Sequence, residues 1–353
     1  MSRQSHTITI REVASDARVS TATVSRALNE PWRVSADARN KVNASVAKLG
    51  YTPNPRARLL ARGSSGTICF LLCNRPFIHS VHAEILQGAS READAMSVQI
   101  VYANCSYSPS TRPSDIEMPR IIAARGLVDG MILAGTNYPN MLAAIDELGL
   151  PYVVFGTNLV SENDVKADNG IYVDDEDGGY QATVHLLSLG HRKIRFIGDT
   201  SLPWYRRRYT GFAMAMAEAG LNSPPPIGSA AESELVMGFN AVNDLYESGE
   251  EFTALFVGGD MGAYGAMRAL RNRGIQVPEE VSVVGFNDED VAQLAEPPLT
   301  TIRAPKEEVG AHCINTLNDI ICAGSIPKRP EVLSVQLVLR LSTARLGDLG
   351  IKS

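Results

Sequence analysis

One short stretch of the sequence combines small polar side chains with a single arginine at helical spacing. In residues 21–28, TATVSRAL, the apolar side chains of Val24, Ala27 and Leu28 fall on one side of a helix. The opposite side carries Thr21, Ala22, Ser25 and Arg26. Hydroxyl, methyl and guanidinium groups on a free helical side can bind a polar partner, as the second helix of a helix-turn-helix does.

The residues before this stretch predict the helix that positions it. Thr9 and Glu12 have the spacing of a capping box, so a first helix is expected from about Ile10. Its inner side would carry Val13, Ala14 and Ala17, with Val19 at the turn. Ser20 is a good cap for the second helix. Residues 9–29 therefore predict a helix-turn-helix, and a plain helical hairpin packed on a core is the alternative.

A third helix is expected after this pair. Ser35 can cap its start, and Gly50 fits the position that follows a helix end. Apolar residues recur between them at helical spacing: Ala38, Val42, Val46 and Leu49. Residues 1–52 therefore predict an all-α headpiece of three helices.

Charge is divided unevenly along the chain. Residues 1–62 hold 11 Lys and Arg against 4 Asp and Glu, a net of +7, whereas residues 63–353 hold 22 against 35, a net of −13. Basic side chains that bind phosphates release counterions, which supplies most nonspecific affinity for nucleic acid. The basic head therefore favours DNA as its partner, a property that the whole-chain net charge of −6 hides.

Residues 53–66 predict a short helix followed by a flexible tether. Asn54 can cap this helix, and Pro55 suits its first position. Barely two turns follow, which is too short for a helix to be stable alone. Arginines and leucines within it make it a candidate for folding on DNA, and a solvated linker with incidental arginines is the alternative.

Length and composition limit the class of protein. A chain of 353 residues with 44% apolar content suggests two or three domains. The first residues, MSRQSHTITIREV, contain no continuous apolar run, and no later run of about 18 apolar residues occurs, so a cytoplasmic protein without a membrane segment is expected.

Cysteines and histidines do not indicate a metal site. The five cysteines lack paired CxxC spacing, so buried free thiols are expected rather than disulfides or zinc ligands. His79 and His82 have HxxH spacing, but no third ligand is indicated. The sequence therefore predicts neither a metal nor a cofactor.

From Thr67 onward, short apolar strands alternate with helical stretches. The strand TICFLLC precedes the helix AEILQGASREADAM, and the alternation repeats in the second half, for example in TALFV before GAMRALRNRG. This pattern predicts an α/β domain with two doubly wound parallel sheets. Loops at the carboxyl ends of the strands should converge on a site. Those loops begin with Asn74, Gly135, Gly156, Asp199, Gly259 and Asn287.

An enzyme is the competing class of protein. The segment GGDMGAYG follows a strand and opens a helix, like a phosphate-binding glycine turn, but its spacing differs from GxGxxG. No set of nucleophile, base and orienting residue is recognisable either. A sugar-binding protein without DNA binding would leave the basic head without a role. Catalysis is therefore not expected.

Six blocks of the sequence, in order, resemble the LacI/GalR family of transcriptional regulators, and the resemblance runs from Ile8 to about Leu346. The blocks are VASDARVSTATVSRALN, YTPNPRARLLARG, GLVDGMILAG, VDDEDGGYQATVHLLSLGHRKIRFIGD, RRYTGFAMAMAEAG, and VPEEVSVVGFND with PPLTTIR. The resemblance implies a helix-turn-helix headpiece followed by a periplasmic-binding-protein-like (type I) effector domain of two subdomains.

The resemblance also implies domain limits. These are a headpiece at 1–52, a hinge helix and linker at 53–66, an effector-binding and dimerisation domain at 67–346, and a tail at 347–353. Within the effector domain, the N-subdomain is expected at about 67–172 and 300–328, and the C-subdomain at about 173–297 and 332–346. The chain would cross between them near Tyr172–Asp174, Pro297–Thr301 and Lys328–Val332.

For DNA, the resemblance assigns two kinds of contact on the second helix. Thr21, Ala22 and Arg26 match positions that reach base edges, and Ser20, Thr23, Ser25 and Asn29 match positions that hold phosphates. In the hinge, which begins with Asn54, Leu60 matches a leucine wedged into a base step and Ala57 matches its minor-groove neighbour. Arg18 departs from the family pattern, because this turn position usually carries glycine.

For the effector, the resemblance places a cleft between the subdomains. Arg208 and Asp260 match cleft residues that bond sugar hydroxyls, and Asn287 lies at a strand end where relatives carry Asp or Asn. Asn74, His79 and His82 occupy the loop after the first strand, and Trp204 is either a stacking platform or a packing residue. Gly259 breaks the pattern, because many relatives place asparagine there. A sugar or sugar derivative is expected, with a nucleobase or nucleoside as the alternative.

Two hinges imply two chains on a near-palindromic operator. The tail LGDLGIKS contains no heptads, so a homodimer is expected rather than a tetramer. Whether the effector releases the protein from DNA or tightens its binding is left open by the sequence.

Overall fold

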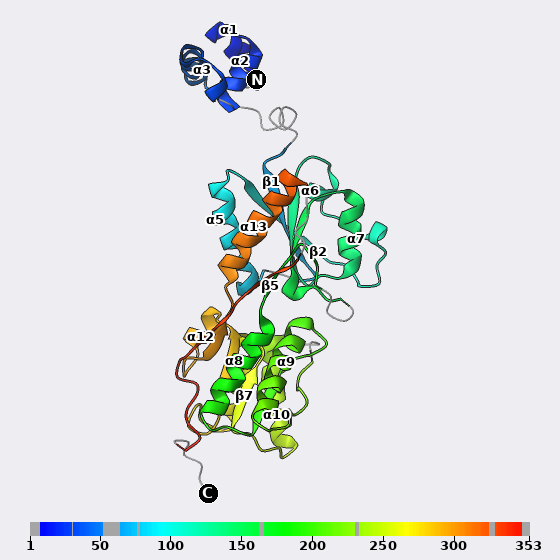
Figure 1. Ribbon diagram of the computed structural model, residues 1–353, viewed down its shortest axis with the longest axis vertical. Helices are drawn as coiled ribbons and strands as arrows, with labels where there is room; N and C mark the ends of the chain where they lie inside the picture. Colours follow the sequence, from blue (N-terminus) through cyan, green and yellow to red (C-terminus); the bar gives the residue numbers. More distant parts are fainter. Residues whose placement is uncertain are drawn as a thin grey trace, which may run out of the picture. The chain divides into compact units, whose positions relative to one another are not determined.

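The computed structural model describes residues 8–29, 31–51, 64–75, 78–161, 166–229, 233–324 and 329–347. The chain divides into two compact units, Met1–Ser65 and Gly66–Ser353 (Figure 1). Among the described residues, no helix is both long and apolar enough to cross a membrane.

The first unit contains the three expected helices, and the prediction of a helical headpiece is confirmed. They are α1 (Ile10–Ala17), α2 (Thr21–Asn29) and α3 (Ala36–Leu49), with a 3-10 turn at Pro31–Arg33. Their shared core consists of Val13, Ala14, Ala17, Val24, Ala27 and Val42. Small side chains in this core allow the short helices to approach closely.

Local hydrogen bonds set the limits of these helices. The Glu12 carboxylate accepts from the backbone N–H and the hydroxyl of Thr9, at 2.7 and 2.8 Å. The Ser20 hydroxyl accepts from the N–H of Thr23 at 3.0 Å, which caps α2. Arg18, at the end of α1, has φ 55° and ψ 44°, a left-handed conformation that favours glycine.

In the second unit, six parallel strands form the first sheet, in the order β10-β5-β4-β3-β1-β2. They are β1 (Thr67–Cys73), β2 (Gln99–Cys105), β3 (Gly130–Gly135), β4 (Tyr152–Phe155), β5 (Gly170–Val173) and β10 (Glu331–Leu333). The accompanying helices are α5 (Ser80–Ala95), α6 (Arg120–Ala123), α7 (Pro139–Leu148) and α13 (Lys306–Ala323), with 3-10 turns at Pro113–Asp115 and Gly156–Asn158.

Helices cover both faces of this sheet. Phe70 and Leu72 of β1 belong to one core cluster with Ile85 of α5, whereas Leu71 belongs to another with Ile145 of α7. Figure 1 shows α5 and α13 on one side of the sheet and α7 on the other. Burial on both faces explains why the strands are continuous apolar runs.

The second sheet has the order β11-β9-β8-β7-β6. Its strands are β6 (Ile194–Ile197), β7 (Ala254–Val257), β8 (Ser282–Asn287), β9 (Thr300–Arg303) and β11 (Gln336–Val338), of which only β11 runs antiparallel to its neighbour. Its helices are α8 (Asp175–Ser188), α9 (Pro203–Glu218), α10 (Glu234–Glu247), α11 (Asp260–Asn272) and α12 (Asp290–Leu294). Two largely parallel sheets match the predicted fold class.

Over the described residues, the chain passes between the two sheets three times. The first passage follows β5, as expected near Tyr172–Asp174. The second, expected near Pro297–Thr301, comes after Arg303 instead, because β9 still pairs with β8. The third, expected near Lys328–Val332, follows Leu333, because β10 still pairs with β5. In both cases a short strand still pairs with its own sheet before the chain crosses to the other.

The cysteines follow the expectation with one exception. All five are free, and Cys69, Cys73, Cys105 and Cys313 are buried. Cys322, near the end of α13, is exposed, so the expectation of burial is wrong for this residue. Burial raises the pKa of the Cys69 thiol to about 12, which keeps it protonated and unreactive.

Candidate nucleic-acid interface and ligand cavity

The outward side of α2 presents exposed side chains. Thr21, Ala22 and Arg26 are exposed, while Val24 and Ala27 on the opposite side are buried. A guanidinium and two small side chains are thus available at the start and middle of one helix. This is the arrangement that lets a recognition helix enter a DNA major groove.

The predicted phosphate contacts flank this surface. Ser20 is exposed and Thr23 is half-buried, and their hydroxyl groups lie 2.8 Å apart at the start of α2. Ser25 is also half-buried. Asn29 is the last residue of α2, and the structure does not describe its side chain. The predicted hinge residues Asn54, Ala57 and Leu60 also lie outside the described residues.

A cavity of about 1010 Å³ lies in the second unit, between the carboxyl ends of strands from both sheets. Six of the seven predicted effector residues line it: Asn74, His79, His82, Trp204, Arg208 and Asn287. The prediction that these loops converge follows from parallel sheet geometry, because loops at the carboxyl ends of such strands meet at one edge.

Asp260, the seventh predicted residue, does not line the cavity. Its side chain is fully buried, and its carboxylate accepts from the N–H of Glu289 at 2.7 Å and from the Thr301 hydroxyl at 2.6 Å. Burial raises the pKa of this carboxyl group to about 8. Asp260 therefore holds the loop after β8, and its expected contact with a ligand is corrected to this positioning role.

Arg208 is held at several points by surrounding groups. Its Nε donates to Asp175 at 2.9 Å, Nη1 donates to the carbonyl of Gly258, and Nη2 donates to Asn287 at 3.3 Å. The guanidinium carbon also lies 3.7 Å from the ring centroid of Phe286. These contacts therefore hold the guanidinium group of Arg208 in one orientation at the cavity wall.

Asp175 anchors two arginines at once and was missed by the sequence analysis. It is 1% exposed, and its Oδ2 accepts from Nε and Nη2 of Arg207 at 3.1 and 2.9 Å. Close packing of α8 on α9 brings these groups together, because a Cβ atom at Gly179 would lie 2.0 Å from the Arg208 carbonyl oxygen. Three further acidic residues adjoin Asp175 in the sequence, so residue type alone could not single it out.

Two contacts connect opposite walls of the cavity. The hydroxyl of Ser80, on α5, donates to the Glu289 carboxylate beyond β8. Lys306, at the start of α13, donates to the backbone carbonyl of Asp288 at 2.9 Å and pairs with Glu84 at 2.8 Å. Ser80, Glu289 and Lys306 also line the cavity, and no motif in the sequence marks them.

Burial favours the neutral form of both histidines in the wall. Burial, reinforced by the charge of Arg75, lowers the pKa of His82 to about 3, and the same causes lower the pKa of His79. His82 Nε2 lies 3.3 Å from Nδ2 of Asn158. No group of three His, Cys, Asp or Glu side chains suited to a metal ion occurs within the described part of the chain.

Trp204 lies in the cavity wall and in the core at the same time. It is 5% exposed, and the guanidinium carbon of Arg75 lies 5.7 Å from its ring centroid. Its ring therefore packs in the core and also lines the cavity, and its role as a stacking platform stays a prediction.

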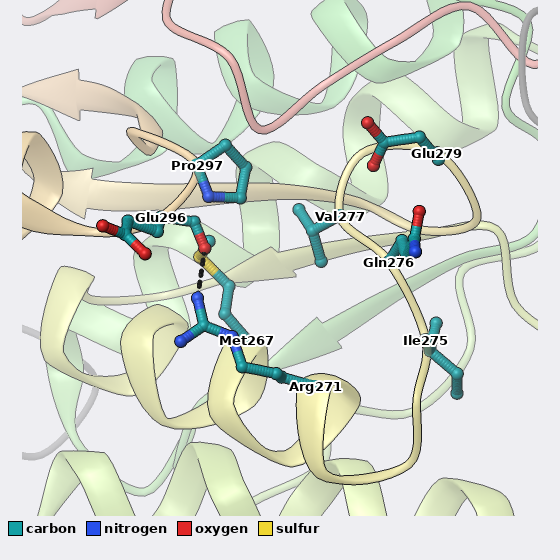
Figure 2. A pocket seen from close by; sticks show the side chains of 8 residues that line it. All are labelled: Met267, Arg271, Ile275, Gln276, Val277, Glu279, Glu296 and Pro297. Carbon is teal, nitrogen blue, oxygen red and sulfur yellow. Dashed lines mark hydrogen bonds between the residues drawn. The ribbon is translucent and has the colours of Figure 1, made fainter.

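A second, smaller pocket of about 220 Å³ lies beside α11 (Figure 2). Figure 2 shows Arg271 directed toward the Glu296 backbone, whose carbonyl accepts from its Nη2 at 2.6 Å. The volume is below the several hundred Å³ usual for ligand pockets, so the larger cavity is the candidate ligand site.

Two protein-family models match the chain. Residues 9–54 match the model described as "Bacterial regulatory proteins, lacI family". Residues 183–343 match the model described as "Periplasmic binding protein-like domain".

Individual relatives match over nearly the whole chain. The HTH-type transcriptional regulator DegA of Bacillus subtilis (strain 168) is 31% identical over 342 residues, which cover 96% of this chain and 98% of DegA. A structure of the transcriptional regulator CelR–cellobiose complex is 29% identical, with a TM-score of 0.68 and coverage of 95% and 99%. The lac repressor dimer bound to operator and an anti-inducer is 26% identical, with a TM-score of 0.79 and coverage of 96% and 100%.

Proposed function

Because the chain belongs to the LacI family of bacterial regulatory proteins, we propose that it regulates transcription by binding an operator, under the control of a small molecule in the cavity. One observation carries the proposal: the same chain combines a helix-turn-helix with a free polar side and a separate unit with a cavity of about 1010 Å³. A DNA-binding unit alone would not need such a cavity.

The DNA contacts of this proposal lie on α2. Arg26 donates two parallel hydrogen bonds to O6 and N7 of a guanine, and Thr21 and Ala22 contact neighbouring base edges, where a thymine methyl group can pack. The phosphate contacts come from Ser20, Thr23, Ser25 and Asn29, beside the positive end of the helix dipole.

A homodimer on a near-palindromic operator is part of the same proposal. In it, the hinge segments of two chains, with Asn54, Ala57 and Leu60, bind at the centre of the site, and Leu60 wedges into a base step. The match to a lac repressor dimer bound to operator supports this arrangement.

The proposed effector is a sugar or sugar derivative. The fixed guanidinium of Arg208 and the amide of Asn287 suit hydroxyl groups, and the ring of Trp204 suits the apolar face of a sugar. Similarity to a regulator bound to cellobiose supports a carbohydrate. A nucleobase or nucleoside is the second candidate, because Trp204 would stack on a base equally well.

Control follows from the position of the cavity between two sheets. A ligand that contacts Ser80 on one side and Glu289 on the other favours one arrangement of the sheets over another. Differential affinity for the two arrangements changes operator affinity by the same free energy. The direction of the change is the outcome of an operator titration with and without ligand.

An electrophoretic shift with DNA from upstream of the gene tests the proposed function. The full chain is expected to shift this DNA, and a chain lacking residues 1–62 is expected not to. Lys41→Ala serves as a charge control, because Lys41 lies on α3 and already pairs with Asp37 at 2.6 Å. Retained specific binding by the truncated chain would contradict the assignment of DNA binding to the headpiece.

A further inference from the structure

Two buried nitrogen atoms in the cavity wall have no hydrogen-bond partner among the described residues. They are Nε of Arg75 and Nδ1 of His82. A buried donor without an acceptor destabilises the folded state, and such groups are uncommon in folded proteins. Six such atoms occur among the described residues, and only these two belong to residues that line the cavity, where a bound molecule can supply an acceptor.

The environment of His82 fixes its Nδ1 atom as a donor. The imidazole is 4% exposed and neutral, so only one of its nitrogens carries a proton. Nε2 faces the Nδ2 group of Asn158, which can only donate, so Nε2 accepts and the proton is on Nδ1. His82 therefore offers one N–H donor to the ligand.

Arg75 forms no ion pair with a described carboxylate, although Glu234 and Glu289 line the same cavity. Other cations of the cavity wall are paired: Arg208 with Asp175 at 2.9 Å, and Lys306 with Glu84 at 2.8 Å. The described contact of Arg75 is instead with the uncharged ring of Trp204. A partly buried cation beside neutral imidazoles attracts an anion, and a guanidinium matches carboxylate and phosphate oxygens well.

The rest of the wall suits hydroxyl groups rather than a second anion. Glu289 lines the cavity with its carboxylate, which accepts from Ser80 and faces the amide of Asn287 at 3.5 Å. Glu234 also lines the cavity, and a negative charge placed beside either carboxyl group would be repelled. The ligand must therefore combine one anionic group with uncharged hydroxyl groups.

We infer that the effector is an acidic sugar derivative, with one carboxylate or phosphate bound by Arg75 and His82. This inference rests on the proposed function only in taking the cavity as the effector site. It replaces the broad class of sugars by polyhydroxylated anions. Carboxylate and phosphate share the required chemistry, and the experiment separates them.

The test is calorimetric titration of the full chain, without DNA, against matched neutral and acidic sugars. The probes are D-glucose, D-glucuronate and D-glucose 6-phosphate, the corresponding D-galactose set, and cellobiose with cellobionate. In at least one set, an acid is expected to bind at least tenfold more tightly than its neutral counterpart. The stronger of the uronate and the phosphate identifies the anionic group.

Variants assign this preference to the proposed residues. Arg75→Gln is expected to weaken the acid at least tenfold and the neutral sugar less than twofold, whereas Arg75→Lys retains part of the preference. His82→Phe removes the second donor and is expected to weaken the acid about fivefold. Arg271→Gln, in the small pocket of Figure 2, is the matched control and leaves both affinities unchanged.

Two results would overturn the inference. One is a panel in which no acid binds more tightly than its neutral counterpart, and the other is an equal effect of Arg75→Gln on both ligands. Failure of the proposed function gives a different pattern, because operator binding is measured separately. An acid preference in a protein whose operator binding ignores the ligand would refute the regulatory proposal and leave this inference intact.

Discussion

Neutralising Asp175 should destabilise the second unit strongly. Asp175→Asn keeps the size of the side chain but removes the charge that faces Arg207 and Arg208, whose side chains are 10% and 6% exposed. Breaking a buried ion pair by removing one partner costs about 3–5 kcal/mol, because the remaining charge is left uncompensated. In a unit of this size, about 2 °C of melting temperature corresponds to each kcal/mol, so a decrease of about 6–10 °C is expected.

Differential scanning calorimetry of the full chain measures this decrease. Asp174→Asn is the matched control, because Asp174 caps α8 by accepting from the N–H of Asp177 at 3.1 Å and asparagine caps equally well. The control should change the free energy of unfolding by less than about 0.5 kcal/mol. A decrease below about 1 kcal/mol for Asp175→Asn would refute the argument, because the two arginines would then find solvent without the carboxylate.

Three further predictions concern other parts of the chain. Arg26→Ala should weaken specific operator binding by about 1–3 kcal/mol, with little effect on binding to unrelated DNA, as measured by fluorescence anisotropy. Arg18→Gly should stabilise the headpiece by about 1 kcal/mol in thermal unfolding, because glycine adopts φ 55° without strain; an unchanged melting temperature would argue against strain. Burial raises the pKa of Asp260 to about 8, so the stability that its protonated form contributes is present at low pH and is lost as the pH rises toward 8. Urea unfolding should therefore show that the advantage of the native protein over Asp260→Asn is larger at pH 5 than at pH 8, and a difference independent of pH would contradict this.

Local signals made the headpiece predictable. Thr9, Ser20, Ser35 and Gly50 each act within four residues of their own position, through caps and a positive φ. The helices therefore lie where the sequence places them. Arg18 has a positive φ at the turn position where relatives usually carry glycine, because turn geometry is decided locally as well.

Long-range contacts explain what the sequence did not reveal. The direction of Asp260 is decided by Thr301, which lies 41 residues further along the chain, and a sequence position at the start of a helix does not specify it. The passage expected near Pro297–Thr301 comes later because β9 still pairs with β8. Arg75 has no motif around it, so its role emerges only from the groups that surround it in space.

The contact between α8 and α9 has a consequence for altering ligand preference by protein engineering. Cβ atoms at Gly179 and Gly211 would lie 2.0 and 1.9 Å from backbone oxygens of the opposite helix, so this pair of helices tolerates no side chain there. Substitutions in the helix contact around Arg208 would therefore lower the yield of folded protein before they change the ligand preference. Libraries for a redesigned sensor should instead vary His79 and Arg75, which lie before α5 and outside that contact.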